Sequence, residues 1–183
     1  MQIGNGNTIR EFVSINTGTV QDAGVTRLGD DNWIMAYVHI AHDCQLGSHL
    51  ILANAVQLAG HVDLGDWVFL GGLSGVHQFV RVGAHAMTAF QTRLAQDVPP
   101  FVTVAGNPAQ AQGINQEGLR RRGYTPERIA AVKQMHKLLY RQGLPLADAR
   151  SAIAQLRDEQ PGSGTDIDLM LGFLASAERG IVR

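Results

Sequence analysis

The stretch LGSHLILANAVQLAGHVD, residues 46–63, places an aliphatic side chain at every sixth position. The same period runs without a gap from residue 28 to residue 82, through Leu28, Ile34, Ile40, Leu46, Leu52, Leu58, Leu64, Leu70, Val76 and Val82. A second register of small or branched side chains follows four residues behind each of these positions. A period of six fits neither an α-helix, with its period of 3.6, nor a simple alternating strand.

A parallel β-helix explains the period, because each hexad then supplies one short strand and one corner, and three hexads make one coil. The pattern predicts full coils at residues 28–45, 46–63 and 64–81, and a decaying coil at 82–99. Earlier hexads begin at Ile3, Ile9 and Ile15. Residues 17–27 break the register and are expected to form a loop that leaves one corner.

The composition changes after the last coil. Residues 97–100, Asp-Val-Pro-Pro, are expected to close the β-helix, because proline cannot donate to a continuing ladder. A turn is predicted at 106–109. Helical spacing then predicts one helix from the N-cap Thr125 to a stop at Gly143, a second over 147–156 and, after a loop at 161–164, a third capped by Thr165. We therefore expect a mainly β chain with a β-helix at 1–110 and a helical region at 111–183.

Size and charge restrict the class of protein. The 183 residues are 45% hydrophobic and carry a formal net charge of −1, which does not favour nucleic-acid binding. There is no run of 18 apolar residues and no signal-peptide pattern at the N-terminus, so we expect no membrane span and a cytoplasmic location. The single cysteine, Cys44, falls on the inward register and is expected to be an inert core thiol.

Histidines gather on one predicted edge. His42, His61 and His77 lie in the third hexads of successive coils, about 4.8 Å apart, and His39 precedes the first of them. Such a group can serve acid–base or metal chemistry. Because Asp43 follows His42 directly, a carboxylate could orient that imidazole, and His42 would then be a general base.

Two further features have open interpretations. His49 and His85 fall on a different edge and are expected to be solvent-facing corner residues. The charge run 120–122, three arginines, is either a solvated cap or an anion site for phosphates, to which guanidinium groups are suited.

The chain also resembles a known family over essentially its whole length. The segments that carry the resemblance are HIAHDC (39–44), LAGHV (58–62), VHQF (76–79), QDVPP (96–100) and NQEGLRRRG (115–123). Their order is similar to that of the acyl-carrier-protein-dependent UDP-N-acetylglucosamine O-acyltransferases, which catalyse the first step of lipid A synthesis.

The resemblance implies a left-handed parallel β-helix, an exception to right-handed crossovers, assembled as a homotrimer with sites between subunits. It implies transfer of an (R)-3-hydroxyacyl group from acyl carrier protein to the 3-hydroxyl of UDP-N-acetylglucosamine. His42 would be the general base, supported by Asp43, and the Gly60 N–H would stabilise the oxyanion. The remaining site residues would line the sugar and acyl positions (His39, His61, His77, Gln78) or bind the nucleotide end or the carrier (Asn115, Glu117, Arg121, Arg122). No bound cofactor or metal is expected, because phosphopantetheine arrives on the carrier protein.

In this family the residue that aligns with Phe90 lies along the acyl groove and is bulky in enzymes that use shorter chains. The resemblance thus implies a donor of about ten carbons, by family analogy, and predicts that Phe90 stacks on Gly72, 18 residues earlier. Alternatively, Phe90 only plugs the end of the β-helix.

The chain departs from the family at two places. Family members have roughly four or five more coils at the N-terminus, and many have His-Arg where this chain has Asn16-Thr17. The first strand would have an uncovered edge, so we expect further coils before Met1 or a cover over that end. Two other functions therefore stay open: a catalytically impaired fragment that acts as a scaffold, and a metal-dependent hydratase of the γ-carbonic-anhydrase type.

Overall fold

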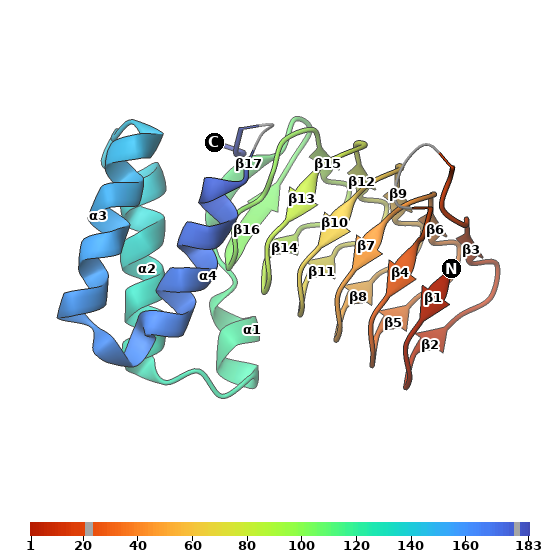
Figure 1. The fold of residues 1–183 in the computed structure, drawn as a ribbon, viewed down its shortest axis with the longest axis horizontal. Coiled ribbons are helices and arrows are strands. Elements are labelled where there is room, and N and C mark those ends of the chain that lie inside the picture. Colours follow the sequence, from red (N-terminus) through yellow and green to blue (C-terminus); the bar gives the residue numbers. More distant parts are fainter. Residues whose placement is uncertain (21–23, 178–179) are drawn as a thin grey trace.

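The computed structural model describes residues 1–20, 24–177 and 180–183 of the chain. Strands of two residues stack into a prism of three parallel sheets, with a group of helices at the end away from the N-terminus (Figure 1). These short strands are β1 Gln2–Ile3, β2 Thr8–Ile9, β3 Ser14–Ile15, β4 Arg27–Leu28, β5 Trp33–Ile34, β6 His39–Ile40, β7 Gln45–Leu46, β8 Ile51–Leu52, β9 Gln57–Leu58, β10 Asp63–Leu64, β11 Phe69–Leu70, β12 Gly75–Val76, β13 Arg81–Val82, β14 Met87–Thr88 and β15 Arg93–Leu94.

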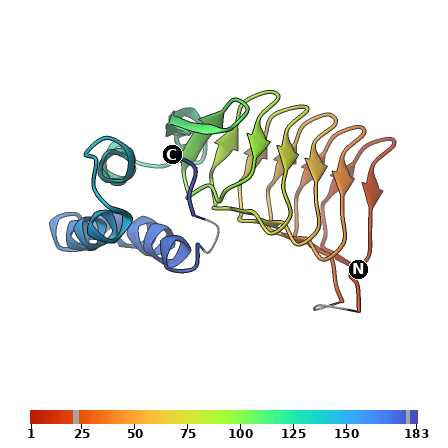
Figure 2. The ribbon, with the colours of Figure 1, turned by 90° about the horizontal axis from the view of Figure 1, so that it is seen from above.

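Each strand pairs with the strand one coil away, which lies 18 residues along the chain from β4 onward and 25 residues along for β1, β2 and β3. The first sheet has the order β1-β4-β7-β10-β13, the second includes β2-β5-β8-β11-β14, and the third has the order β15-β12-β9-β6-β3. The pairing is in register, for example Phe69 opposite both Ile51 and Met87. The view from above shows the coils stacked one behind another (Figure 2). The predicted parallel β-helix is confirmed.

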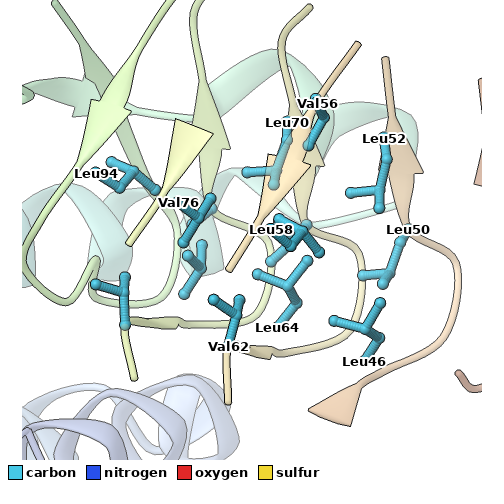
Figure 3. Packing of buried hydrophobic residues seen from close by; sticks show 14 of the residues in the cluster. Leu46, Leu50, Leu52, Val56, Leu58, Val62, Leu64, Leu70, Val76 and Leu94 are labelled. Carbon is cyan, nitrogen blue, oxygen red and sulfur yellow. The ribbon is translucent and has the colours of Figure 1, made fainter. Parts of the chain in front are cut away.

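Both predicted inward registers are buried. The aliphatic side chains of one register and the small or branched ones of the other meet along the axis of the prism (Figure 3), and Ile34, Leu50 and Val62 are each 0% exposed. Polar residues in the last coils satisfy one another, since the Ser74 and Thr88 hydroxyls lie 3.0 Å apart. The core of the prism is thus one continuous cluster, and the edges of the prism present the outward side chains to solvent.

The corners use a left-handed backbone at non-glycine residues. Such conformations cost roughly 1–2 kcal/mol each, but stacking compensates, because the corner N–H groups donate to carbonyl oxygens of the coil before; at Asp43 the acceptor is the Thr26 hydroxyl instead. At His61, where φ is 61°, the N–H donates to the His42 carbonyl at 3.1 Å. The same left-handed position recurs every sixth residue at Asp31, Tyr37, Asp43, His49, Ala55, His61, Trp67, Leu73, Phe79, His85 and Gln91.

The end of the β-helix differs from the prediction. The prolines at 99 and 100 do not stop the ladder, because β16 (Val102–Ala105) follows them and pairs with β14 in the second sheet. The predicted turn at 106–109 then leads to β17 (Gln110–Ile114), which pairs antiparallel with β16. β17 begins at the predicted domain boundary, and that boundary stays a prediction. The predicted loop at 17–27 was one residue too long, because Arg27 already belongs to β4; residues 21–23 of it lie outside the described residues.

The helical region contains α1 (Gln116–Arg121), α2 (Pro126–Tyr140), α3 (Leu146–Glu159), a 3₁₀ turn (Pro161–Ser163) and α4 (Gly164–Ala175). Thr125 caps α2 as predicted, accepting the Arg128 N–H at 3.3 Å. Two predictions were wrong: α2 ends before Gly143, and Thr165 lies inside α4, which has no side-chain cap. The helix α1 was not predicted. Among the described residues, no helix combines the length and the apolar character that a membrane crossing requires.

Candidate active site

The residue pair that carries acid–base potential lies at the corner that follows β6. The His42 Nδ1 atom is 3.0 Å from Asp43 Oδ2, and the His42 side chain is 44% exposed whereas that of Asp43 is 1% exposed. When the Nδ1 atom of a histidine is hydrogen-bonded to a buried carboxylate, Nε2 is the ring nitrogen that faces outward. The corner therefore offers an accessible ring nitrogen on an oriented imidazole.

The loop before β4 surrounds the carboxylate. The Thr19 N–H lies 2.9 Å and the Thr19 hydroxyl 2.8 Å from Asp43 Oδ2, and the Asp43 N–H donates to the Thr26 hydroxyl at 2.9 Å. Burial opposes the ionisation of Asp43, but the hydrogen bonds from His42 and Thr19 outweigh it and lower its pKa to about 2. Asp43 is thus a carboxylate at every pH at which the protein would work. Thr19 was missed by the sequence analysis, since the loop has no period.

Gly60 lies directly against the imidazole of His42. A Cβ atom at Gly60 would be 2.6 Å from His42 Cε1 and 2.8 Å from Nε2, distances that real Cβ atoms do not show. No hydrogen bond among the described residues uses the Gly60 N–H, while its carbonyl accepts the Phe79 N–H at 3.2 Å. The absence of a side chain here allows close approach of the ring to the backbone.

The four histidines of the predicted edge divide into two pairs. The rings of His42 and His61 meet edge to face at 5.1 Å, and Phe79 stacks on His61 at 4.5 Å. His39 and His77 instead line a groove on the third sheet. The hexad to which a residue belongs determines the edge of the prism near which it lies, but its position within the hexad determines where its side chain points. His77 directly follows the inward Val76, and its side chain therefore lines the groove.

The groove has a volume of about 450 Å³, and its floor is formed by β6, β9, β12 and β15. His39 Nδ1 lies 2.8 Å from the Ser14 hydroxyl, and His77 Nδ1 lies 3.1 Å from the Gln78 carbonyl. Phe90 is 63% exposed at the corner that leads into β15. A Cβ at Gly72 would be 3.4 Å from its ring, so the predicted stacking of Phe90 over Gly72 is confirmed.

A second cleft gathers the remaining predicted site residues. Asn115, Glu117, Arg121 and Arg122 line it from α1 and its flanks, opposite His49 and Trp67, and its volume is about 460 Å³. Glu117 and Arg121 pair across one helical turn at 3.2 Å. This cleft faces the corner between the first and second sheets, whereas His42 stands at the corner between the third and the first. One chain therefore carries the two groups of residues on different edges.

Three donor groups could hold a metal ion. Ligand atoms of His42, Asp43 and His61 lie within 4.8 Å of one another. Two of these residues, His42 and His61, belong to the histidine group on the predicted edge, whereas His39 and His77 are not part of the set. The Asp43 oxygens are already engaged by Thr19 and His42, so a cation would have to compete with these hydrogen bonds.

The coils built of hexads place the chain in the class of hexapeptide-repeat transferases. A family profile described as bacterial transferase hexapeptide (six repeats) matches residues 26–60, and one described as UDP N-acetylglucosamine O-acyltransferase, domain 2, matches residues 97–182. The chain belongs to the acyl-[acyl-carrier-protein]–UDP-N-acetylglucosamine O-acyltransferase family, whose members are acyltransferases of lipid A synthesis.

Individual relatives support this assignment. The family enzyme of Janthinobacterium sp. (strain Marseille) is 58% identical over all 183 residues, which cover 70% of that protein, and that of Verminephrobacter eiseniae (strain EF01-2) is 60% identical over 181 residues, covering 69%. The UDP-N-acetylglucosamine acyltransferase structure from Francisella novicida is 42% identical, with a TM-score of 0.94 over 99% of this chain and 65% of that chain. The Acinetobacter baumannii structure gives 44% and 0.91, covering 99% of this chain and 69% of that one. The chain thus spans about two thirds of these relatives, and its left-handed β-helix fold is confirmed.

Proposed function

We propose that the chain contributes the catalytic corner of an enzyme that moves an (R)-3-hydroxyacyl group from acyl carrier protein to the 3-hydroxyl of UDP-N-acetylglucosamine. The observation that carries the proposal is the His42–Asp43 pair at 3.0 Å, on an exposed corner of a chain of this family. The donor brings its own phosphopantetheine, so no resident cofactor is required.

The chemistry follows from the pair. The unprotonated Nε2 of His42 takes the proton of the sugar 3-hydroxyl as its oxygen bonds to the thioester carbonyl carbon. The carboxylate of Asp43 stabilises the imidazolium that results, and the Gly60 N–H donates to the oxyanion. When the tetrahedral intermediate collapses, the C–S bond breaks and His42 returns the proton to the leaving thiolate. The product is an ester, and the second product is the thiol of the carrier.

The other residues take binding roles in this proposal. His39, His61, His77 and Gln78 contact the sugar and the acyl chain, and Phe90 limits the length of the acyl chain. Asn115, Glu117, Arg121 and Arg122 bind the nucleotide end or the carrier, and their guanidinium groups suit phosphates.

A homotrimer accounts for the separation of the two groups of residues. Because the His42 corner and the cleft of Arg122 lie on different edges of one prism, a single acceptor can touch both only where two copies meet. Cyclic symmetry then builds three equal sites. The expected cytoplasmic location stays a prediction.

The test is an acyl-transfer assay with purified chain, a 3-hydroxydecanoyl carrier protein and UDP-N-acetylglucosamine, beside a full-length relative as positive control. Ester formation supports the proposal. A chain that is trimeric by light scattering but inactive would be the scaffold instead.

The three grouped ligand atoms of His42, Asp43 and His61 keep the hydratase as a second candidate. Elemental analysis and a carbon dioxide hydration assay, with and without zinc, separate the two enzymes. Zinc-dependent hydration without acyl transfer would replace the proposal.

A further inference from the structure

Two groups on the edge of the β-helix hold the guanidinium of Arg122 at the wall of the second cleft. Its Nη1 lies 3.2 Å from His85 Nδ1, and its Nη2 donates to the Trp67 carbonyl at 3.1 Å. Its Cζ is 5.1 Å from the centroid of the Trp67 ring, a cation–π distance. A guanidinium has five N–H groups. The hydrogen bonds to described residues use two of them, which leaves the others for a ligand.

The contact with His85 requires one protonation state. A guanidinium can only donate, so His85 Nδ1 must accept and the ring hydrogen must be on Nε2. That hydrogen has an acceptor, because Tyr124 Oη lies 3.2 Å from Nε2. Burial, followed by the charge of Arg122, lowers the pKa of His85 to about 4. The imidazole is therefore neutral at neutral pH and able to accept from Arg122.

The helical region holds His85 from the other side. The Arg128 guanidinium lies 3.8 Å from the centroid of the Tyr124 ring and donates to both oxygens of Asp166 at 2.8 Å. Asp166 is 2% exposed, so this ion pair joins α2 to α4 in a partly buried place. The connection runs from Asp166 through Arg128, Tyr124 and His85 to Arg122.

We propose that His85 is a positioning residue, which holds the Arg122 guanidinium in the orientation that binds the phosphates of the acceptor's nucleotide end. This inference rests on the proposed function of Arg122. The expectation that His85 is a solvent-facing corner residue was wrong, because its ring contacts partners that are 37 and 39 residues away in the sequence. The competing role is packing alone, since His85 also stacks between Trp67 at 6.4 Å and Phe101 at 5.5 Å.

Two substitutions separate positioning from packing. His85→Phe keeps a flat ring but removes the acceptor, and His85→Gln restores an acceptor oxygen without the ring. Both fit the backbone, where φ at His85 is 63°, because Phe79 has 63° and Gln91 has 56° at equivalent corners. The measurements are the Kd of UDP by calorimetry, kcat, and the KM values of donor and acceptor.

The loss of a hydrogen bond to a charged group predicts that His85→Phe raises the UDP Kd and the acceptor KM about tenfold. The kcat and the donor KM stay within about twofold, because the reacting atoms lie on another edge. His85→Gln recovers most of the affinity. A packing role predicts the reverse order, with the glutamine variant at least as impaired as the phenylalanine variant.

Arg122→Ala distinguishes the possible failures. If Arg122→Ala binds UDP as tightly as the wild type, the proposed role of Arg122 is wrong. If it loses UDP while His85→Phe binds normally, only the positioning role is wrong. Should His85→Phe unfold, Tyr124→Phe removes just the hydroxyl that fixes Nε2; an unchanged acceptor KM in that variant would overturn the inference.

Discussion

His42 Nδ1 lies 3.0 Å from Asp43 Oδ2, and this contact joins a half-exposed imidazole to a buried carboxylate. Adjacent residues can meet in this way because the corner turns sharply at Asp43, where φ is 59°. The turn sends the carboxylate inward under the loop that contains Thr19, while the imidazole remains at the surface. This arrangement suits the proposed role of His42 as a base whose ring is oriented by Asp43.

Removal of the imidazole tests the base directly. We expect His42→Ala to lower kcat/KM for acyl transfer about 10²–10⁴-fold in a protein of full family length. The melting temperature should fall by no more than a few degrees, because a corner side chain that is 44% exposed contributes little packing. Retention of more than a tenth of the wild-type kcat/KM would contradict the assignment of His42 as the general base.

The pH profile should report an imidazole and not the carboxylate. Because hydrogen bonds hold the pKa of Asp43 at about 2, Asp43 does not titrate between pH 5.5 and 8. A histidine base that works unprotonated then makes kcat/KM rise with pH over that range. A flat profile over that range would count against a histidine base, and a requirement for added zinc would favour the hydratase.

Gly60→Ala should disable the site without removing any polar group. The new Cβ would stand 2.6 Å from His42 Cε1, so the imidazole must rotate away from its present position against Gly60. We expect kcat to fall at least about tenfold, since misplacement by 1 Å can cost 10²-fold. Gly113→Ala is the matched control, because a Cβ there meets nothing within 4 Å. Equal activity of the two variants would show that the approach of ring to backbone is unimportant.

The parts of the structure that could be predicted follow from local repetition. Residues such as Val62 and Val68 are buried because their place in the hexad dictates it, and His42 meets Asp43 because they are neighbours. The contacts of Thr19 with Asp43 and of Arg122 with His85 span 24 and 37 residues and depend on paths without a period. The short helix α1 was missed for the same reason, since six residues carry too little periodicity.

Acid should weaken the connection between the β-helix and the helical region. The titratable and charged groups that face His85 are Arg122, Tyr124, Arg128, Asp66 and Asp166. Burial, followed by the charge of Arg122, lowers the pKa of His85 to about 4. As the pH falls, the imidazole of the unfolded chain is protonated at a higher pH than that of the folded protein. The contribution of His85 to the free energy of unfolding is therefore complete above about pH 6.5 and is lost as the pH falls toward 4. We expect a loss on the order of 1–3 kcal/mol in the free energy of unfolding. Urea titrations of wild type and His85→Gln should diverge between these pH values, and parallel curves would contradict the prediction.

The length of the preferred donor should depend on Phe90. Its ring lies 3.4 Å from a Cβ position at Gly72 and stands, 63% exposed, at the corner before β15, whose residues close one end of the groove of His39 and His77. A phenyl ring occupies the volume of several methylenes, and a filled groove tolerates overlap poorly. We expect the wild type to prefer 3-hydroxyacyl donors of about ten carbons, by family analogy, and Phe90→Gly to accept longer ones.

Tyr37→Ala, at the same edge but stacked on Phe12, is the control that should leave the preference unchanged. A donor series from ten to sixteen carbons decides the matter: an unchanged preference in Phe90→Gly, or a wild type that already favours fourteen carbons, would assign Phe90 to packing at the end of the prism.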